Sequence, residues 1–148
     1  MLHSEKIRIL LVNDDKHVCD VLGLILESRG YEVDVAHTGD EAIEKSKTNA
    51  YNLAVLDNGL PDIESKKLLR AMHEFSPKMI RIIGTEIIRL QDAPDAFNDC
   101  ADGYFANPVE PGLLIRLIEE KLEEQKDAKT ARGKKLRAHI ESKTRKLS

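Results

Sequence analysis

Short apolar runs that end in polar, turn-forming residues recur along the chain. Such runs are typical of strands buried in a parallel sheet, whereas alternation of apolar and polar residues is typical of a half-exposed edge strand. The pattern predicts five strands, at residues 7–12, 31–36, 53–57, 79–83 and 103–106. In the third run, four apolar residues lead directly to Asp57, and the turn-forming pairs Asn58-Gly59 and Leu60-Pro61 follow. Asp57 is therefore expected at the carboxyl end of a buried strand.

Apolar residues at helical spacing occupy the intervals between the predicted strands. They predict helices at residues 18–29, 38–49, 65–76 and 111–122, and the second of these opens with a capping box that begins at Thr38. The segment 86–99 also has helical character, but it contains Pro94, which breaks the hydrogen-bond ladder of an α-helix. A short, kinked or displaced helix is expected there.

Strands that alternate with helices predict an α/β fold, here a doubly wound, five-stranded parallel sheet with helices on both faces. The common strand order 2-1-3-4-5, with right-handed crossovers, places the topological switch point between the first and third strands. Asn13, Asp14 and Asp15 follow the first strand, and Asp57 ends the third. The topology is thus expected to bring these acidic residues together at one edge of the sheet.

Length and composition describe one globular domain. A chain of 148 residues with 41% hydrophobic and 33% charged residues can build one core and present a polar surface. No window approaches about eighteen consecutive apolar residues, and no apolar signal region follows Met1, so a cytoplasmic location without membrane contact is expected. Cys19 and Cys100 lack metal-ligand spacing and are expected to be reduced.

Charge divides the chain near Gln125. Residues 126–148 carry nine Lys or Arg and two Asp or Glu, a net charge of +7, which leaves −10 on residues 1–125 out of −3 for the whole chain. We therefore expect a domain at residues 1–125 and a basic tail at residues 126–148, which is either an amphipathic helix interrupted at Gly133 or disordered. A solvated extension or a linker is the simpler interpretation of the basic tail, and nucleic-acid contact is the alternative.

The acidic residues at the switch point suit a divalent cation. Two carboxylates about 4 Å apart repel by roughly 4 kcal/mol at an effective dielectric near 20, and a cation between Asp14 and Asp57 would remove that cost. Oxygen ligands on loops favour Mg²⁺, which retains several waters and leaves a position open to a phosphoryl oxygen. The alternative is that these aspartates are solvated loop residues that cap helices.

Several short motifs stand at the predicted strand ends. They are Leu10-Leu11-Val12-Asn13-Asp14-Asp15, Val55-Leu56-Asp57 with Leu60-Pro61-Asp62, Ile82-Ile83-Gly84-Thr85, and Ala101-Asp102-Gly103-Tyr104 with Asn107-Pro108. Together and in this order, over residues 7–121, they resemble the response-regulator receiver domain of two-component signalling. The resemblance implies the flavodoxin-like fold of that family.

The resemblance implies a role for each matching residue. Asp57 matches the phosphoacceptor, which takes a phosphoryl group from a sensor histidine kinase or a phosphotransfer protein. Asp14 and Asp57 match Mg²⁺ ligands, together with the backbone carbonyl of Gly59. Thr85 matches the hydroxyl residue that bonds the phosphoryl group, and Tyr104 matches the aromatic residue whose rotamer follows that movement.

Three departures from the family pattern are expected to weaken this site. Asn13 replaces an acidic residue, so it contacts a metal only through a bound water and Mg²⁺ is expected to bind weakly. Asn107 replaces the lysine before the proline, and loss of one preorganised donor to a transition-state charge costs about 3–4 kcal/mol. Glu86 adds a negative charge near the phosphoryl position. Lys16 and Arg89, in neighbouring loops, are the candidates for a replacement cation.

The expected function is a receiver module that is phosphorylated on Asp57 and then switches a face that binds a downstream output protein. It is not expected to be an enzyme, beyond self-phosphorylation from small donors and autodephosphorylation. The alternative, favoured by Asn13, Asn107 and Glu86, is a degenerate pseudo-receiver that binds a partner protein without phosphorylation. A Mg²⁺-dependent phosphatase is disfavoured because Gly59 stands where a second acid would be required.

Overall fold

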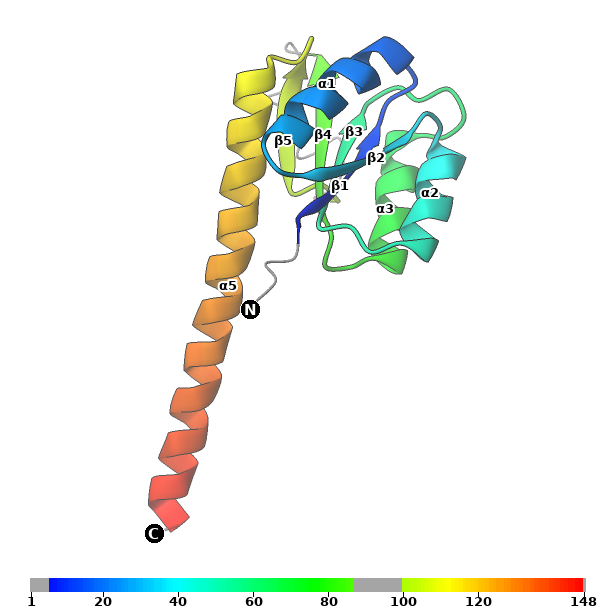
Figure 1. Ribbon diagram of the computed structural model, residues 1–148. Coiled ribbons are helices and arrows are strands. Elements are labelled where there is room, and N and C mark those ends of the chain that lie inside the picture. The colour runs from blue at the N-terminus through cyan, green and yellow to red at the C-terminus, as the bar shows by residue number, and fades with distance from the viewer. Residues whose placement is uncertain (1–5, 87–99, 148) are drawn as a thin grey trace.

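The computed structural model describes residues 6–86 and 100–147. One parallel sheet forms its centre, in the order β2-β1-β3-β4-β5 (Figure 1). Its strands are β1 (Arg8–Val12), β2 (Glu32–Ala36), β3 (Leu53–Asp57), β4 (Ile80–Glu86) and β5 (Gly103–Asn107). The predicted flavodoxin-like sheet and its strand order are confirmed.

Helices cover both faces of the sheet. The described helices are α1 (Lys16–Ser28), α2 (Gly39–Thr48), α3 (Ser65–Phe75) and α5 (Pro111–Leu147). Apolar residues of α1 and α5 pack against one face, and those of α2 and α3 pack against the other (Figure 1). The helix expected at residues 86–99, with its Pro94, lies outside the described residues.

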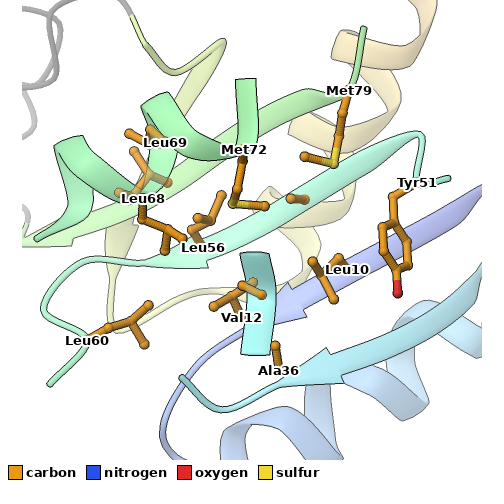
Figure 2. Packing of buried hydrophobic residues seen from close by; sticks show 13 residues of the cluster. Leu10, Val12, Ala36, Tyr51, Leu56, Leu60, Leu68, Leu69, Met72 and Met79 are labelled. Atoms are coloured by element: carbon orange, nitrogen blue, oxygen red, sulfur yellow. The ribbon is translucent and has the colours of Figure 1, made fainter. Parts of the chain in front are cut away.

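The central strands are buried on both sides, because successive side chains of a strand point to opposite faces of the sheet. Ile9 and Leu11 of β1 pack under α1 and α5, whereas Leu10 and Val12 pack under α2 and α3. Figure 2 shows the second layer, in which Met72 of α3 lies over the strands. This double burial fixes the carboxyl ends of the central strands and the loops that follow them.

The fourth and fifth strands are longer than the apolar pattern predicts. The pattern ends at Ile83 and Ala106, whereas β4 continues to Glu86 and β5 to Asn107. The reason is pairing between the two strands, since residues 84–86 lie in register with residues 105–107. Such pairing is non-local and leaves no periodic signal in either run. Its consequence is that Asn107 remains part of the sheet, opposite Glu86.

The last helix is much longer than the predicted one. Its apolar face, with Leu114, Ile115 and Ile118, is buried against the sheet, and the helix then continues through Gly133 to Leu147. The helix extends well beyond the sheet (Figure 1), so the structure has the helical form of the basic tail rather than the disordered one. Among the described helices, none is both long and apolar enough to cross a membrane.

Candidate functional site

The ends of three strands meet at one cavity at the carboxyl edge of the sheet. Asn13 and Asp14 follow β1, Asp57 ends β3, and Asn107 ends β5. All four residues line a cavity of about 520 Å³. The strand order explains this arrangement, because β1 and β3 are paired side by side and the loops after them are therefore neighbours. The structure thus gathers four residues that are up to about ninety positions apart in the chain.

A direct hydrogen bond joins Asp57 to Asn107. The Asn107 Nδ2 donates to Asp57 Oδ1 at 2.6 Å. Gly84 of β4 lies between the two residues and pairs with Asp57 on one side and Phe105 on the other. A Cβ at Gly84 would lie 2.9 Å from Asn107 Nδ2 and would overlap the Phe105 ring. The absence of a side chain at Gly84 therefore permits the contact between Asp57 and Asn107.

The electrostatic surroundings of Asp57 disfavour its charged form. Burial raises the pKa of Asp57 above its ordinary value, the hydrogen bond from Asn107 opposes that rise, and the negative charge of Asp14 adds to it. The protein alone therefore leaves the ionised carboxylate under-stabilised. A cation near both carboxylates would reverse this effect, because it would offset the loss of hydration and the mutual repulsion.

The polar residues of the loop after β1 differ in whether their side chains make hydrogen bonds within the loop and helix or face solvent. Asp15 caps α1, since its Oδ1 accepts hydrogen bonds from His17 N at 2.9 Å and Val18 N at 3.2 Å. Asn13 Oδ1 accepts from Asp15 N at 2.9 Å, and Asp14 is exposed. Within residues 6–86 and 100–147, no group of three or more His, Cys, Asp and Glu residues is placed to hold a metal ion. A divalent ion at this edge would depend on two carboxylates and on neutral oxygens.

Three residues expected at the site lie outside the lining of the cavity. Gly59 has a φ of +95°, in the left-handed region that favours glycine, and it lines a separate hollow formed by residues 58–65. Thr85, which is 3% exposed, is one residue beyond Gly84 on β4. Tyr104 is half-buried and packs against the apolar layer under α2 and α3.

Of the two candidates for a replacement cation, the one that the structure describes, Lys16, does not line the cavity. Lys16 is exposed at the first position of α1, and Arg89 lies outside the described residues. His17, the next residue of α1, does line the cavity. No Lys or Arg of the described ranges is part of the lining. The amide of Asn107 is thus a neutral donor at a position where the expected family has a cation.

The loop after β3 is anchored to α2 by Asp62, a contact that sequence reasoning missed. Asp62 Oδ1 accepts from Gly39 N and Oδ2 accepts from Asp40 N, both at 2.9 Å. These backbone hydrogen bonds hold the pKa of Asp62 below its ordinary value. The Ile63 side chain packs over Gly39 in space that a Cβ would occupy. The anchor fixes the loop that carries Gly59. The local signal for it was the N-terminus of α2, where the first backbone N–H groups favour an anion.

One wall of the cavity is apolar, which the helical pattern did not reveal. Val18, Val21 and Leu22 of α1 line it, together with Phe105 and Val109 from β5 and the loop that follows. Val21 belongs to the apolar face of the predicted helix, yet its side chain is 42% exposed at this cavity. The cavity therefore combines charged and amide groups at the strand ends with an apolar wall that is open to solvent.

The geometry agrees with comparisons to known proteins. The family model described as the response regulator receiver domain matches residues 9–119. The regulatory protein VanRB of Enterococcus faecalis is 34% identical over 113 residues, which make up 76% of this chain and 51% of that protein. The transcriptional regulatory protein DltR of Streptococcus agalactiae is 30% identical over 111 residues, 75% of this chain and 50% of that protein. The chain thus spans about half the length of these curated relatives.

Two solved receiver structures match over nearly their whole length. A CheY-like receiver domain from Methanospirillum hungatei JF-1 has a TM-score of 0.76 and 39% identity, and the match covers 83% of this chain and 98% of that chain. A two-component response regulator from Clostridium difficile has a TM-score of 0.73 and 27% identity, with 80% and 97% of the two chains covered. The unmatched part of this chain is therefore larger than the unmatched part of either structure.

Proposed function

Because this chain belongs to the response regulator receiver domain family of two-component signalling, we propose that it is phosphorylated on Asp57. Receiver domains are phosphoacceptor regulatory modules rather than classical enzymes, and the family implies a histidine kinase as partner. The observation that carries the proposal is the position of Asp57. It ends the buried strand β3 in a solvent-open cavity that it shares with Asp14 and Asn107.

In the proposed reaction, Asp57 is the nucleophile. One carboxylate oxygen attacks the phosphorus of a phosphohistidine on the donor, so that an O–P bond forms while the P–N bond breaks and the imidazole leaves with the electron pair. The hydrogen bond from Asn107 to Oδ1 orients the carboxylate and leaves Oδ2 for the attack. Positioning supplies most of the rate enhancement in phosphoryl transfer, because little covalent chemistry falls to the protein itself.

The residues at the site fit Mg²⁺, the metal ion that the family uses. Asp14 and Asp57, which line the cavity, would hold the ion, and Asn13 would contact it through a water. The carbonyl of Gly59, on the loop after β3, is the further ligand that the family pattern implies, although Gly59 lines a separate hollow in this structure. When bound, Mg²⁺ supplies positive charge that offsets the phosphoryl oxygens and the two carboxylates. The raised pKa of Asp57, in part caused by Asp14, supports this assignment. With two carboxylates rather than three acidic side chains, weak affinity is expected.

Thr85 and Tyr104 carry the response in this proposal. The Thr85 hydroxyl, near the end of β4, donates a hydrogen bond to a phosphoryl oxygen on Asp57. Tyr104 of β5 is paired with Ile83 of β4, so a displacement of β4 changes the packing of the Tyr104 ring. The Tyr104 ring is half-buried against the apolar layer. In this proposal the ring moves between this packing and a second one toward solvent, and the output protein binds the face that one of the two packings creates.

The apolar wall of the cavity supports docking of the phosphoryl donor next to Asp57. Val18 and Val21 of α1 and Val109 of the loop after β5 form that wall. Val21 and Leu24, one helical turn apart on α1, are 42% and 70% exposed. Apolar side chains at these positions suit a helix of the kinase whose histidine must reach Asp57.

A phosphoryl mimic tests the proposal. The chain is incubated with Mg²⁺ and beryllofluoride, and NMR spectra are recorded with and without the reagent. The expected result is a set of shifts at Thr85 and Tyr104 that the Asp57→Asn variant does not show. The proposal fails if saturating reagent leaves both residues unchanged in the wild-type chain.

The second candidate is a receiver that binds its partner without phosphorylation. Asn107 favours it, because this residue donates directly to Asp57 and no Lys or Arg of the described ranges lines the cavity. Partner binding separates the two candidates. The pseudo-receiver binds equally well as wild type and as Asp57→Asn, with or without a phosphodonor, whereas the phosphorylated receiver changes its affinity only when Asp57 is present.

A further inference from the structure

The basic tail is presented as an exposed helix beyond the globular part of the chain. Over residues 126–143, the described side chains are exposed except for the half-buried Gly133 position. The last residues of α5 with buried side chains are Leu114, Ile115 and Ile118, which lie against the sheet. Figure 1 shows α5 leaving the sheet and continuing alone for about half of its length. The packing of the globular part therefore does not explain the composition of the basic tail.

The charge of this exposed helix is opposite to that of the globular part. The basic tail carries +7, whereas residues 1–125 carry −10. Lys126, Lys129, Arg132, Lys135 and Lys143 are exposed, and none of the salt bridges that the described residues form includes them. Like charges along one helix repel one another, so an anionic partner would stabilise the helix.

We propose that the basic tail binds the phosphate backbone of duplex nucleic acid. An α-helix turns about 100° per residue, and the nine basic positions of the basic tail are then spread around its whole circumference. A helix in the major groove has phosphates on both sides, because the groove is about 12 Å wide and the helix nearly fills it. The helical part of the basic tail is about 33 Å long, close to one turn of duplex.

The distribution of apolar residues disfavours a membrane surface. Leu136, Ile140 and Leu147 are the large apolar residues of the basic tail, and their positions share one side of the helix with Lys129 and Lys143. An interfacial helix needs a wide, uninterrupted apolar face to insert between lipid chains. The same lack of an apolar face disfavours a stable pairing with a second copy of the chain, whose interface would need an apolar core.

The proposed contacts are to phosphates and are independent of base sequence. Phosphate contacts release counterions, so the logarithm of the affinity falls linearly with the logarithm of the salt concentration, with a slope near −0.9 per phosphate. If the basic tail makes six or more contacts, the affinity falls by about a thousandfold or more between roughly 50 and 200 mM salt. The negative charge of residues 1–125 keeps the globular part away from the duplex.

The test measures binding of the full chain to a labelled random duplex of about 30 base pairs, by fluorescence anisotropy at several salt concentrations. One variant combines Lys129→Gln, Arg132→Gln and Lys135→Gln. We expect it to reduce the salt slope by about three and the low-salt affinity by at least about tenfold. The matched control removes the same charge from the globular part, with Lys67→Gln, Arg70→Gln and Lys78→Gln, all at exposed positions on or just after α3. The control is expected to bind at least as tightly as the wild-type chain.

Circular dichroism confirms that each variant keeps its helix content, which glutamine supports nearly as well as lysine and arginine. The proposal is overturned if the wild-type chain does not bind duplex at about 20 mM salt, or if the two triple variants bind equally. It is also overturned if phosphatidylserine vesicles, rather than duplex, bind the basic tail. Self-association by sedimentation without duplex binding would assign the basic tail to a second copy instead.

Discussion

At the scale of single residues, the site depends on how Asp57 is surrounded. Its carboxylate is partly removed from water, faces the charge of Asp14 and receives one hydrogen bond from Asn107. A lysine at position 107 would stabilise the ionised form by charge, whereas an amide does so by one hydrogen bond only. Asp57 is therefore a carboxylate whose charge the protein alone stabilises incompletely.

Substitution of Asp57 by Asn is expected to stabilise the metal-free chain at neutral pH. Because burial raises the pKa of Asp57 in the folded chain, the folded state binds the proton more tightly than the unfolded state does. Protonated Asp57 therefore contributes to the free energy of unfolding at pH values below the pKa that Asp57 has in the unfolded chain. This contribution is lost as the pH rises through the higher pKa that Asp57 has in the folded chain. Urea denaturation without Mg²⁺ at pH 7 should give Asp57→Asn a higher free energy of unfolding than wild type. Asp20→Asn, at an exposed position of α1, is the control, and a less stable Asp57→Asn would contradict this account.

Removal of the Asn107 amide is expected to raise the pKa of Asp57 further. The hydrogen bond from Asn107 favours the charged carboxylate, so Asn107→Ala removes the one interaction that lowers this pKa. An NMR titration of the Asp57 side-chain carbon follows the change in both proteins. An unchanged or lower pKa in the variant would show that the hydrogen bond does not form in solution.

At the scale of secondary-structure elements, the packing of α3 and the sheet fixes the position of β3. Leu69 of α3 is fully buried, and Figure 2 shows it in the layer above Leu56. Leu69→Ala is expected to lower the free energy of unfolding by about 2–5 kcal/mol, because it removes buried methyl groups and leaves a cavity. Leu24→Ala, at a position 70% exposed, should change it by less than about 0.5 kcal/mol. Chemical denaturation measures both, and equal effects would contradict the described core.

Gly133 is expected to lower the stability of the helix α5 in its C-terminal part. Glycine in a helix interior costs about 1 kcal/mol relative to alanine, and Gly133 lies in the part of α5 that extends beyond the sheet. Gly133→Ala should therefore increase helix content and slow amide hydrogen exchange in residues 126–147. Gly23→Ala in α1, where a Cβ has nothing within 4 Å, provides a control in the packed domain. If exchange in the basic tail does not slow, that segment is not helical in solution.

Local patterns predicted most elements, because the periodicity of apolar residues reports which side of an element is buried. Strand order placed Asp14 near Asp57 without any contact being known. Contacts between distant residues leave no such pattern. The anchor formed by Asp62 and the start of α2 joins positions 23 residues apart. The extension of β4 to Glu86 likewise depends on pairing with β5.

The buried Arg81 illustrates the same limit. In the sequence, Arg81 interrupts an apolar run, but in the structure it is 6% exposed and has partners about twenty residues further along the chain. Its Nη2 lies 3.9 Å from Asp102 Oδ2, and its Nε donates to Cys100 O at 3.2 Å. The residue that satisfies a buried charge can lie anywhere in the chain, so its identity cannot be predicted from the run in which the charge occurs.

At the scale of the whole molecule, the chain combines an acidic receiver domain with a basic helix of opposite charge. The family match covers residues 9–119, so the conclusions about the receiver do not extend to the basic tail. Phosphorylation would replace the single negative charge of the Asp57 carboxylate by the roughly two charges of an acyl phosphate, a net gain of about one negative charge in a domain that already carries −10. The two proposals are independent, because the site at the strand ends and the basic tail share no residue.

The most direct test of the central claim is intact-protein mass spectrometry after incubation with a small phosphodonor and Mg²⁺. The account predicts that wild-type chain gains the mass of one phosphoryl group, that Asp57→Asn does not, and that removal of Mg²⁺ abolishes the gain. An unmodified wild-type chain at excess donor and Mg²⁺, or equal modification of Asp57→Asn, would contradict the assignment of Asp57 as phosphoacceptor.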